Sequence, residues 1–292
     1  VAGKGHEKTQ DYGGKQKFFS DKKIILSSIK RKNKFLSKDL KLNIIKEQSK
    51  SSISKKITIK NASINSREIR KKDVFFAIKG KRIDGNDFIL DAFKKRSSLA
   101  IVNKIKKDCP KSKQIKVKDT LKFLTQCSSK FRENINTKII SITGSCGKTT
   151  LKEMLGSTLN KIFKTSYSPK SFNNKYGVPL SLFNLHQKDN FGVFEVGMDK
   201  KGEIDSLTKI ISPDLGIITN ISYAHSKNFS NIKGIADAKA EIIDNIRSNG
   251  ILILNGDDDF FNYHKKIGEK KGLKILSFGL KKSFFSTALI KI

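Results

Sequence analysis

Residues 143–150 read Thr-Gly-Ser-Cys-Gly-Lys-Thr-Thr and directly follow the apolar run Ile139-Ile140-Ser141-Ile142. Glycines allow the tight turn that points backbone N–H groups at phosphate oxygens, while a lysine and a hydroxyl serve the terminal phosphates and Mg²⁺. The strict phosphate-loop pattern has a further glycine five positions before Gly147, where this chain has Ile142, so the loop is a shorter variant. The stretch predicts a nucleotide-binding loop made by Gly144, Ser145, Cys146, Gly147, Lys148, Thr149 and Thr150.

The segment after the loop has apolar residues at the spacing of an amphipathic helix. They are Leu151, Met154, Leu155, Leu159, Ile162 and Phe163. A helix that begins at the loop directs its dipole at bound anions, which strengthens the prediction of a phosphate site.

Apolar runs that end in polar residues recur from about residue 137 onward and alternate with helical patterns. Such buried strands between helices predict a mostly parallel sheet, and ligands bind beyond the carboxyl ends of its strands. The polar residues expected at that edge are Lys148, Thr149, Glu195, His225 and Asn255. We therefore expect an α/β fold in which residues 137–292 form a phosphate-loop ATPase domain.

The preceding hundred residues predict a smaller α/β domain, over 35–136. Its strand-like runs are Ile57–Ile59, Val74–Ile78 and Leu99–Val102, and a helical stretch surrounds Phe88–Lys95. Residues 1–34 are rich in glycine and then in basic residues, which predicts a tail and a linker.

The composition is strongly basic, with 60 Lys and Arg against 27 Asp and Glu and a net charge of +33. The lysines are spread along the whole chain, and neither interleaved aromatic residues nor zinc-finger spacing accompanies them, so we do not expect nucleic acid as a partner. Three cysteines without a Cys-x-x-Cys motif fit a reducing compartment. Since no apolar stretch reaches 18 residues, we expect a cytoplasmic protein without membrane insertion.

Individual site residues carry alternative readings. Glu195, at a strand end, is an oxygen ligand for Mg²⁺ beside Thr149, or else a solvated carboxylate. His225 is a metal ligand or a structural hydrogen-bonding residue, and helical spacing alone makes Lys239 an ordinary exposed lysine. Asn173-Asn174 precedes Gly177 and Pro179, which is typical of a turn. Cys146 is either an oxidisable thiol or a small loop residue that contributes through its backbone N–H group. These residues alone predict a magnesium–nucleotide phosphotransferase or ATPase.

Further short motifs follow the loop along the chain. They are Ser171-Phe172-Asn173-Asn174 with Gly177-Val178-Pro179, Glu195-Val196-Gly197-Met198 with Gly202-Glu203-Ile204, Asn220-Ile221 with Ala224-His225, Ala238-Lys239-Ala240-Glu241, and Asn255-Gly256-Asp257-Asp258. Upstream stand Asn65-Ser66-Arg67, Asp73–Gly80 and Asp84–Phe88. Together they resemble the Mur ligases of peptidoglycan synthesis, and within that family the MurF branch.

The resemblance implies ATP-dependent amide formation through an acyl phosphate, with UDP-N-acetylmuramyl tripeptide and D-alanyl-D-alanine as substrates. It implies catalytic roles for Lys148, Glu195, His225 and Lys239, the last a lysine that some relatives carbamylate. It implies Mg²⁺ ligation by Thr149, Glu195 and His225, and adenine and ribose contacts by Asn255, Asp257 and Asp258. Substrate binding would fall to Ser66, Arg67, Asn173 and Asn174.

Residues 1–33, with Gly3-Lys4-Gly5-His6-Glu7, resemble the C-terminal end of the preceding ligase, MurE. We therefore expect a fragment of a MurE–MurF fusion, or a misjoined reading frame. Such a fragment lacks the family's C-terminal domain, so it would bind nucleotide as a monomer without ligating. Two alternatives stay open: a folylpolyglutamate synthetase of the same superfamily, and a basic nucleotide-binding module that is not an enzyme.

Overall fold

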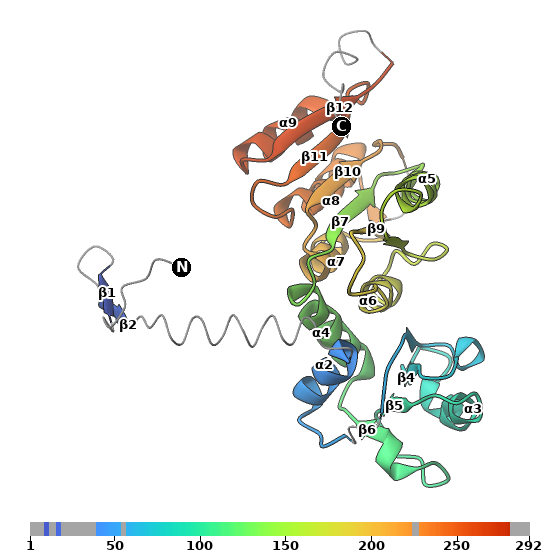
Figure 1. Cartoon of the computed structure of the whole chain (residues 1–292). Coiled ribbons are helices and arrows are strands. Elements are labelled where there is room, and N and C mark those ends of the chain that lie inside the picture. The colour runs from blue at the N-terminus through green and yellow to red at the C-terminus, as the bar shows by residue number, and fades with distance from the viewer. Residues whose placement is uncertain (1–8, 12–15, 19–38, 54–56, 224–227, 281–292) are drawn as a thin grey trace. The chain divides into compact units, whose positions relative to one another are not determined.

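A six-stranded parallel sheet organises the second half of the chain in the computed structural model, which describes residues 9–11, 16–18, 39–53, 57–223 and 228–280 (Figure 1). The strand order is β12-β11-β10-β7-β9-β8, and every neighbouring pair is parallel. The strands are β7 (Lys138–Thr143), β8 (Thr165–Tyr167), β9 (Phe191–Glu195), β10 (Leu215–Ile218), β11 (Ile251–Asn255) and β12 (Lys274–Phe278).

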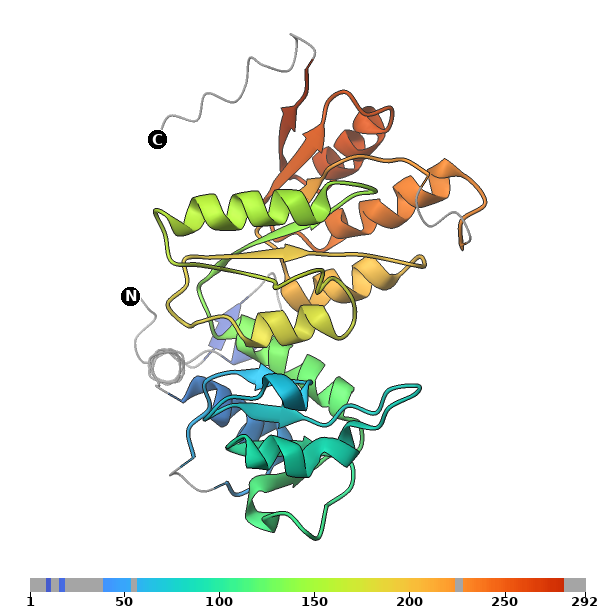
Figure 2. The same cartoon turned by 90° about the vertical axis from the view of Figure 1, so that its right-hand side faces the viewer.

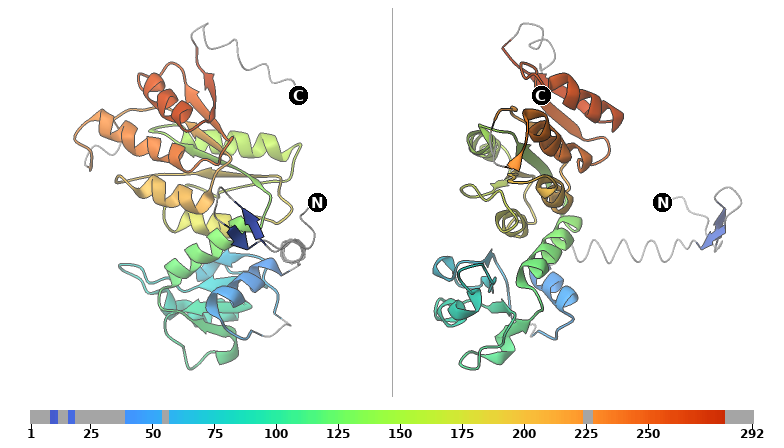
Figure 3. Two further views of the ribbon diagram at one scale, coloured as in Figure 1. Left: turned by 90° about the vertical axis from the view of Figure 1, so that its left-hand side faces the viewer. Right: turned by 180° about the vertical axis from the view of Figure 1, so that it is seen from behind.

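Helices cover both faces of this sheet (Figures 1 and 3). Helix α5 (Lys148–Asn160) packs Leu151, Leu155 and Leu159 against one face, because these residues recur at the period of one helix side. On the other face lie α8 (Ile232–Asp244) and α9 (Phe261–Lys270). The remaining helices of this part are α6 (Gly177–Phe183) and α7 (Glu203–Ile211).

Strand β7 lies at the point where the strand order reverses. After β7 the chain builds β8 and β9 on one side of it, and then continues with β10 on the other side. The connections at the carboxyl end of β7 therefore diverge and leave a crevice, which is where open parallel sheets bind ligands. The loop after β7 is the predicted phosphate loop.

A second parallel sheet, of four strands in the order β3-β4-β5-β6, precedes the larger one. Its strands are β3 (Ala62–Ser63), β4 (Val74–Phe76), β5 (Leu99–Val102) and β6 (Gln114–Lys116). Around it lie α2 (Leu40–Ser49), α3 (Ile89–Lys94), α4 (Thr120–Glu133) and the 3₁₀ turns Ser66–Glu68, Gly85–Phe88 and Lys111–Lys113. The predicted α/β class, with mostly parallel sheets, is confirmed.

The prediction of a strand over Ile57–Ile59 is wrong. The chain enters the sheet only at Ala62, which pairs with Val74. Ile59 is nevertheless buried, so the apolar signal in this run reflects burial and not strand pairing. Conversely, the sequence pattern gave no sign of β8, a short strand at the sheet edge whose residues are partly polar.

Aromatic side chains pack together where β4, α4 and α6 meet, and Figure 2 shows the ribbons of these elements. Phe76 of β4 contacts Phe123 of α4 and Phe183 of α6, with ring centroids 6.5 and 6.3 Å apart, and Phe131 contacts Phe183 at 5.6 Å. The long helix α4 supplies two of these rings, so it forms the packed link between the small sheet and the large one.

By its internal contacts the chain divides into residues 1–40 and residues 41–292. In the first unit the described strands β1 (Thr9–Asp11) and β2 (Gln16–Phe18) form an antiparallel pair. The MurE-like motif over residues 3–7 lies outside the described residues. Among the described helices, none has the length and apolar character needed to cross a bilayer.

Candidate functional site

The predicted phosphate loop joins β7 to α5 and turns at two glycines with positive φ. Gly144 has φ +145°, and a Cβ there would lie 1.8 Å from Oγ1 of Thr219. Gly147 has φ +80° and is the residue before the first turn of α5. Both positions therefore require glycine, the first because another loop packs against it and the second because of its left-handed backbone.

The connection after β10 holds the loop in this conformation. Backbone N–H groups of Ser145 and Cys146 donate to the main-chain and side-chain oxygens of Asn220, each at 2.9 Å. Thr219 Oγ1 donates to the Cys146 carbonyl at 2.6 Å, and Ser145 Oγ donates to the Ser222 carbonyl at 3.0 Å. Cys146 is thus fixed through its backbone while its side chain is exposed, which supports the reading of this residue as a loop filler.

Lys148 extends back over the loop. Its Nζ donates to the carbonyl of Gly144 at 2.8 Å and to the carbonyl of Ser145 at 3.3 Å. The ammonium group therefore stands where the loop turns, at the N-terminus of α5, and combines its charge with the helix dipole. This arrangement concentrates positive charge at the loop, which favours a bound anion.

Thr149, Glu195 and Asn173 form a hydrogen-bonded chain beside the loop. Thr149 Oγ1 donates to Glu195 Oε2 at 2.7 Å, and Asn173 Nδ2 donates to Glu195 Oε1 at 2.8 Å. Glu195 is only 2% exposed, so the reading of it as a solvated carboxylate is wrong. Its position follows from the end of β9, which lies next to β7 in the sheet.

The donor atoms of this chain fit Mg²⁺ in kind. A hydroxyl and a carboxylate supply hard oxygen ligands, and a nucleotide-bound Mg²⁺ uses one or two such groups and completes its shell with phosphates and water. Within residues 9–11, 16–18, 39–53, 57–223 and 228–280, no three His, Cys, Asp or Glu residues cluster to hold a metal by themselves. His225, the third predicted ligand, lies outside the described residues.

Lys239 is buried on α8 with 2% exposure, so the expectation of an ordinary exposed lysine is wrong. Burial, and next the positive charge of Lys148, lower its pKa to about 7, although Cys146 acts in the opposite direction. No described carboxylate forms an ion pair with it. At neutral pH a large fraction of this amine is therefore uncharged, which is the nucleophilic form.

The polar residues at the end of β11 and just after it form hydrogen bonds to the backbone nearby. Asp258 Oδ2 accepts from the N–H of Ile221 at 2.7 Å, Asn255 Oδ1 accepts from the N–H of Asp257 at 3.0 Å, and Asp257 Oδ2 accepts from the N–H of Leu280 at 2.6 Å. Asn255 and Asp258 line a small cavity together with Asn220, which holds the phosphate loop. All three predicted residues thus lie at the same end of the sheet as the loop.

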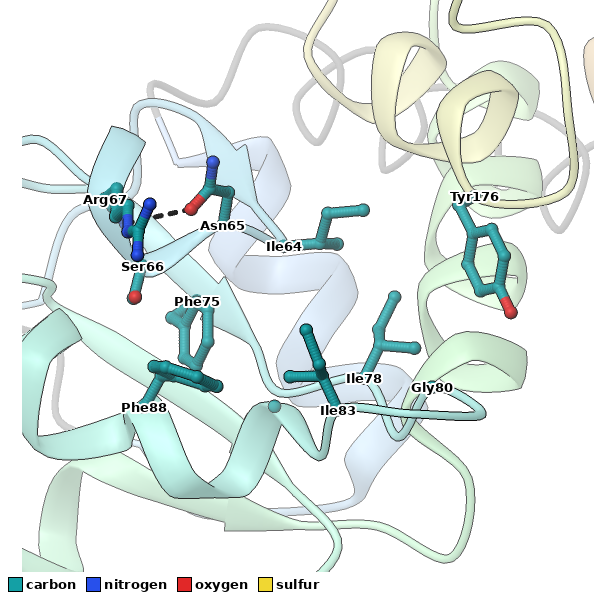
Figure 4. A pocket seen from close by; sticks show the side chains of 11 residues that line it. Ile64, Asn65, Ser66, Arg67, Phe75, Ile78, Gly80, Ile83, Phe88 and Tyr176 are labelled. Atoms are coloured by element: carbon teal, nitrogen blue, oxygen red, sulfur yellow. Dashed lines mark hydrogen bonds between the residues drawn. The ribbon is translucent and has the colours of Figure 1, made fainter.

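The predicted substrate residues Ser66 and Arg67 line a cavity of about 430 Å³ beside the small sheet (Figure 4). Phe75 and Phe88 contribute an apolar wall, and Tyr176 reaches the cavity from the segment before α6. The size suits a nucleoside or sugar group, since ligand pockets commonly measure about 300–1,000 Å³.

Asn173 and Asn174, both predicted to bind substrate, form different contacts. Asn173 carries the amide that contacts Glu195. The Asn174 oxygen accepts from the N–H groups of Tyr176 and Gly177, both at 3.1 Å. Asn174 therefore fixes the start of α6, as the turn reading predicted, and so orients Tyr176.

Sequence reasoning missed Lys152 and Tyr176. Lys152 is fully buried on α5, pairs with Glu153 at 2.9 Å, and donates to the carbonyl of Lys170, in the segment that leads to Asn173. In a chain with 60 basic residues, nothing in the sequence separates one buried lysine from the exposed ones. Tyr176 lies within the Asn-rich motif, and only the folded structure shows that it lines the cavity beside the small sheet.

Family models match two parts of the chain: the model of the Mur ligase middle domain over residues 142–291, and that of the Mur ligase family catalytic domain over residues 58–132. Among curated proteins, the UDP-N-acetylmuramoyl-tripeptide–D-alanyl-D-alanine ligase of Rickettsia prowazekii (strain Madrid E) is 37% identical over 210 residues, 72% of this chain and 46% of the relative. That of Buchnera aphidicola subsp. Acyrthosiphon pisum is 36% identical over 79% of this chain and 50% of the relative.

Solved structures give the same result. MurF from Acinetobacter baumannii superposes with a TM-score of 0.71 at 33% identity, covering 81% of this chain and 52% of that one. MurF ligase from Thermotoga maritima, solved in complex with ADP, superposes with a TM-score of 0.65 at 30% identity, covering 77% and 52%. The chain spans about half the length of the curated relatives it matches. On the strength of these matches, which include both sheets and the phosphate loop, the chain belongs to the Mur ligase family.

Proposed function

We propose that the chain carries the nucleotide-binding and UDP-substrate-binding parts of an ATP-dependent ligase that joins D-alanyl-D-alanine to UDP-N-acetylmuramyl tripeptide. The observation that supports this most strongly is the phosphate loop with the Thr149–Glu195–Asn173 chain beside it, in a protein whose curated relatives are named for this reaction. Cytoplasmic location, a monomeric state and the absence of nucleic acid as a partner stay predictions.

In this proposal the loop binds the phosphates of ATP. The amides of the loop and the start of α5 provide hydrogen-bond donors, and Lys148 exchanges its contacts with the carbonyls of Gly144 and Ser145 for phosphate oxygens. Thr149 and Glu195 would hold Mg²⁺, which neutralises phosphate charge when bound, and His225 would assist at a second ion. The adenine and ribose would lie toward Asn255, Asp257 and Asp258.

The cavity at the small sheet would take the UDP end of the substrate. Ser66 and Arg67 supply the polar contacts, and Tyr176 closes the cavity from the side of the larger sheet. The peptide would run from there toward Asn173 and Asn174, which precede Tyr176 by three and two residues in the chain. The terminal carboxylate of the substrate then approaches the γ-phosphate from the side of Glu195.

The reaction follows in two transfers. A carboxylate oxygen of the tripeptide attacks the γ-phosphorus, the bond to the bridging oxygen of ATP breaks, and an acyl phosphate and ADP result. The amine of D-alanyl-D-alanine attacks the acyl carbon, phosphate leaves, and the nitrogen loses a proton as the amide forms. The chain's own residues contribute mainly by holding the reacting groups in line and by placing the charge of Lys148 near the transferred phosphoryl group.

We also propose that Lys239 is carbamylated, as the family resemblance implies. Its burial and its pKa of about 7 favour the neutral amine that reacts with CO₂. The neutral nitrogen attacks the carbon of CO₂ and loses one proton, which converts the uncharged amine into an anionic carbamate. Incubation with ¹³C-bicarbonate should give a carbamate carbon signal that is missing in Lys239→Met.

Calorimetry on the chain tests the binding proposals. Mg·ADP and UDP-N-acetylmuramyl tripeptide should each bind saturably, and Lys148→Ala should lose nucleotide affinity by more than about tenfold, or about 1.4 kcal/mol. The matched control is Lys161→Ala, which removes an exposed lysine just beyond the same helix. Tight binding of a folate in place of the UDP substrate would favour the folylpolyglutamate synthetase alternative.

Ligation is tested in a protein that also contains the additional sequence present in the relatives. Release of phosphate should then depend on both D-alanyl-D-alanine and the UDP-linked tripeptide, and Lys148→Ala should abolish it with the circular dichroism spectrum unchanged. Near-normal turnover in the Lys148→Ala variant would contradict the proposal that this loop binds the phosphates of ATP.

A further inference from the structure

Another cavity, of about 150 Å³, lies at the β8 edge of the large sheet, apart from the phosphate loop. Its walls come from β8, from the segment that follows it, from α6 and from β9. Its lining includes Tyr167, Phe172, Ser181, Leu185 and Phe194. None of the roles assigned above uses this cavity.

The deep part of the cavity is apolar. Leu185 and Phe194 are 1% and 0% exposed, and the rings of Tyr167 and Phe172 form the half-buried part of the wall. No lining residue carries a charged side chain. A charged ligand would lose its hydration without gaining a partner, so the cavity selects an uncharged, largely apolar occupant.

The Ser181 hydroxyl is a buried polar group of the wall for which the described part of the chain provides no hydrogen-bond partner. Ser181 is 7% exposed, and its Oγ is buried without a hydrogen bond to any described protein atom. The neighbouring amide of Asn184, which also lines the cavity, is already engaged on both sides by Ala62. A buried hydroxyl without a partner is destabilising, and a ligand with one matching polar group would supply the missing hydrogen bond.

The volume sets the size of the occupant. An apolar protein cavity of about 150 Å³ is known to hold one benzene molecule. We propose that this cavity is a binding site for an uncharged single-ring aromatic compound with one hydroxyl group, which hydrogen-bonds to Ser181 Oγ while its ring contacts Phe172 and Phe194.

The proposed binding cavity lies next to the hydrogen-bonded pair of Asn173 and Glu195 in the candidate functional site. Phe172 directly precedes Asn173, and Phe194 directly precedes Glu195. Asn173 and Glu195 are joined by a hydrogen bond beside the phosphate loop. A ring in the cavity would therefore pack behind both members of that bond. The binding proposal itself depends only on the cavity, and it stands or falls separately from the proposed ligase reaction.

Phenol and toluene are the probes for the test, which is ligand-observed NMR with the 292-residue chain. Phenol should bind saturably, and Ser181→Ala should weaken it by about three- to tenfold, the worth of one hydrogen bond, while toluene binds both proteins equally. The matched control is Ser141→Ala, which removes another buried hydroxyl without a partner, in β7 and outside the cavity. It should leave phenol affinity unchanged.

Ser181→Leu fills the space and should abolish binding of both probes. Because this larger side chain could prevent folding, circular dichroism accompanies it, and Ser181→Ala decides the question alone if Ser181→Leu does not fold. The proposal is overturned if phenol shows no saturable binding up to about 10 mM, or if Ser141→Ala weakens it as much as Ser181→Ala does.

Discussion

The side chain of Asn184 pairs with the backbone of Ala62 as a neighbouring strand would. Its Oδ1 accepts from the Ala62 N–H at 2.6 Å, and its Nδ2 donates to the Ala62 carbonyl at 2.9 Å. Ala62 begins β3, and Asn184 directly follows α6. One amide thus joins the sheet that carries the 430 Å³ cavity to the helix that follows Tyr176.

Asn184→Ala should lower the free energy of unfolding by about 1–3 kcal/mol, because it leaves two backbone groups of Ala62 without their partners. Urea unfolding followed by circular dichroism measures the change. Asn262→Ala, at an exposed position of α9, is the control and should stay within about 0.5 kcal/mol of the parent. Equal effects of the two substitutions would contradict the bridging role.

Gly144→Ala should destabilise the phosphate loop more than Gly272→Ala destabilises its own turn. Both glycines have positive φ, so both substitutions introduce backbone strain of about 1 kcal/mol or more. A Cβ at Gly144 also lies 1.8 Å from Thr219 Oγ1, whereas one at Gly272 meets nothing within 4 Å. The excess cost from overpacking is about 1–3 kcal/mol. Thermal unfolding of both variants, with calorimetry of ADP binding, provides the comparison.

Thr149→Val should reduce the affinity for Mg·ADP by at least about tenfold, or about 1.4 kcal/mol. The affinity for ADP measured in EDTA should change much less, because in the proposed function the lost hydroxyl binds Mg²⁺ beside Glu195, to which it donates a hydrogen bond. Thr149→Ser keeps the hydroxyl and should stay near the parent. Thr158→Val, at an exposed position of the same helix, controls for the loss of a threonine hydroxyl. An equal loss with and without Mg²⁺ would refute the metal-binding role.

Lys239 should make stability depend on pH. Its pKa of about 7 in the folded protein lies below the ordinary value of about 10.4 for an unfolded lysine. Between these values the unfolded chain binds a proton that the folded chain does not, so stability rises with pH, by at most about 1.4 kcal/mol per unit. The burial cost is fully present below pH 7.

Lys239→Met should therefore remove this rise between about pH 7 and about pH 10.4, a window set by the lysine's folded and unfolded pKa values. Urea unfolding at several pH values in CO₂-free buffer measures it, and Lys161→Met, which replaces an exposed lysine, should keep the rise. A Lys239→Met protein with the same pH profile as the parent would show that Lys239 is charged in the fold.

Local sequence patterns were sufficient to predict the features that depend on residues close together in the chain. The phosphate loop follows from glycine conformation and the strand and helix on either side of it, and the alternation of apolar runs with helical patterns gave the parallel sheet. The prediction of a strand over Ile57–Ile59 was wrong because apolar residues indicate burial without indicating strand pairing. Strand β8 was not predicted because an edge strand of three residues carries little apolar signal.

By itself, then, the sequence determined the fold class, the phosphate loop and the family, because these rest on residue types at fixed spacing. Only the tertiary structure decided that Glu195 and Lys239 are buried, that Asn173 joins Glu195 while Asn174 fixes the start of α6, and that Lys152 lies inside. Burial and hydrogen-bond partners arise from residues that are distant along the chain. The charge, pKa and contacts of a side chain follow from those neighbours, and no local pattern of residues specifies them.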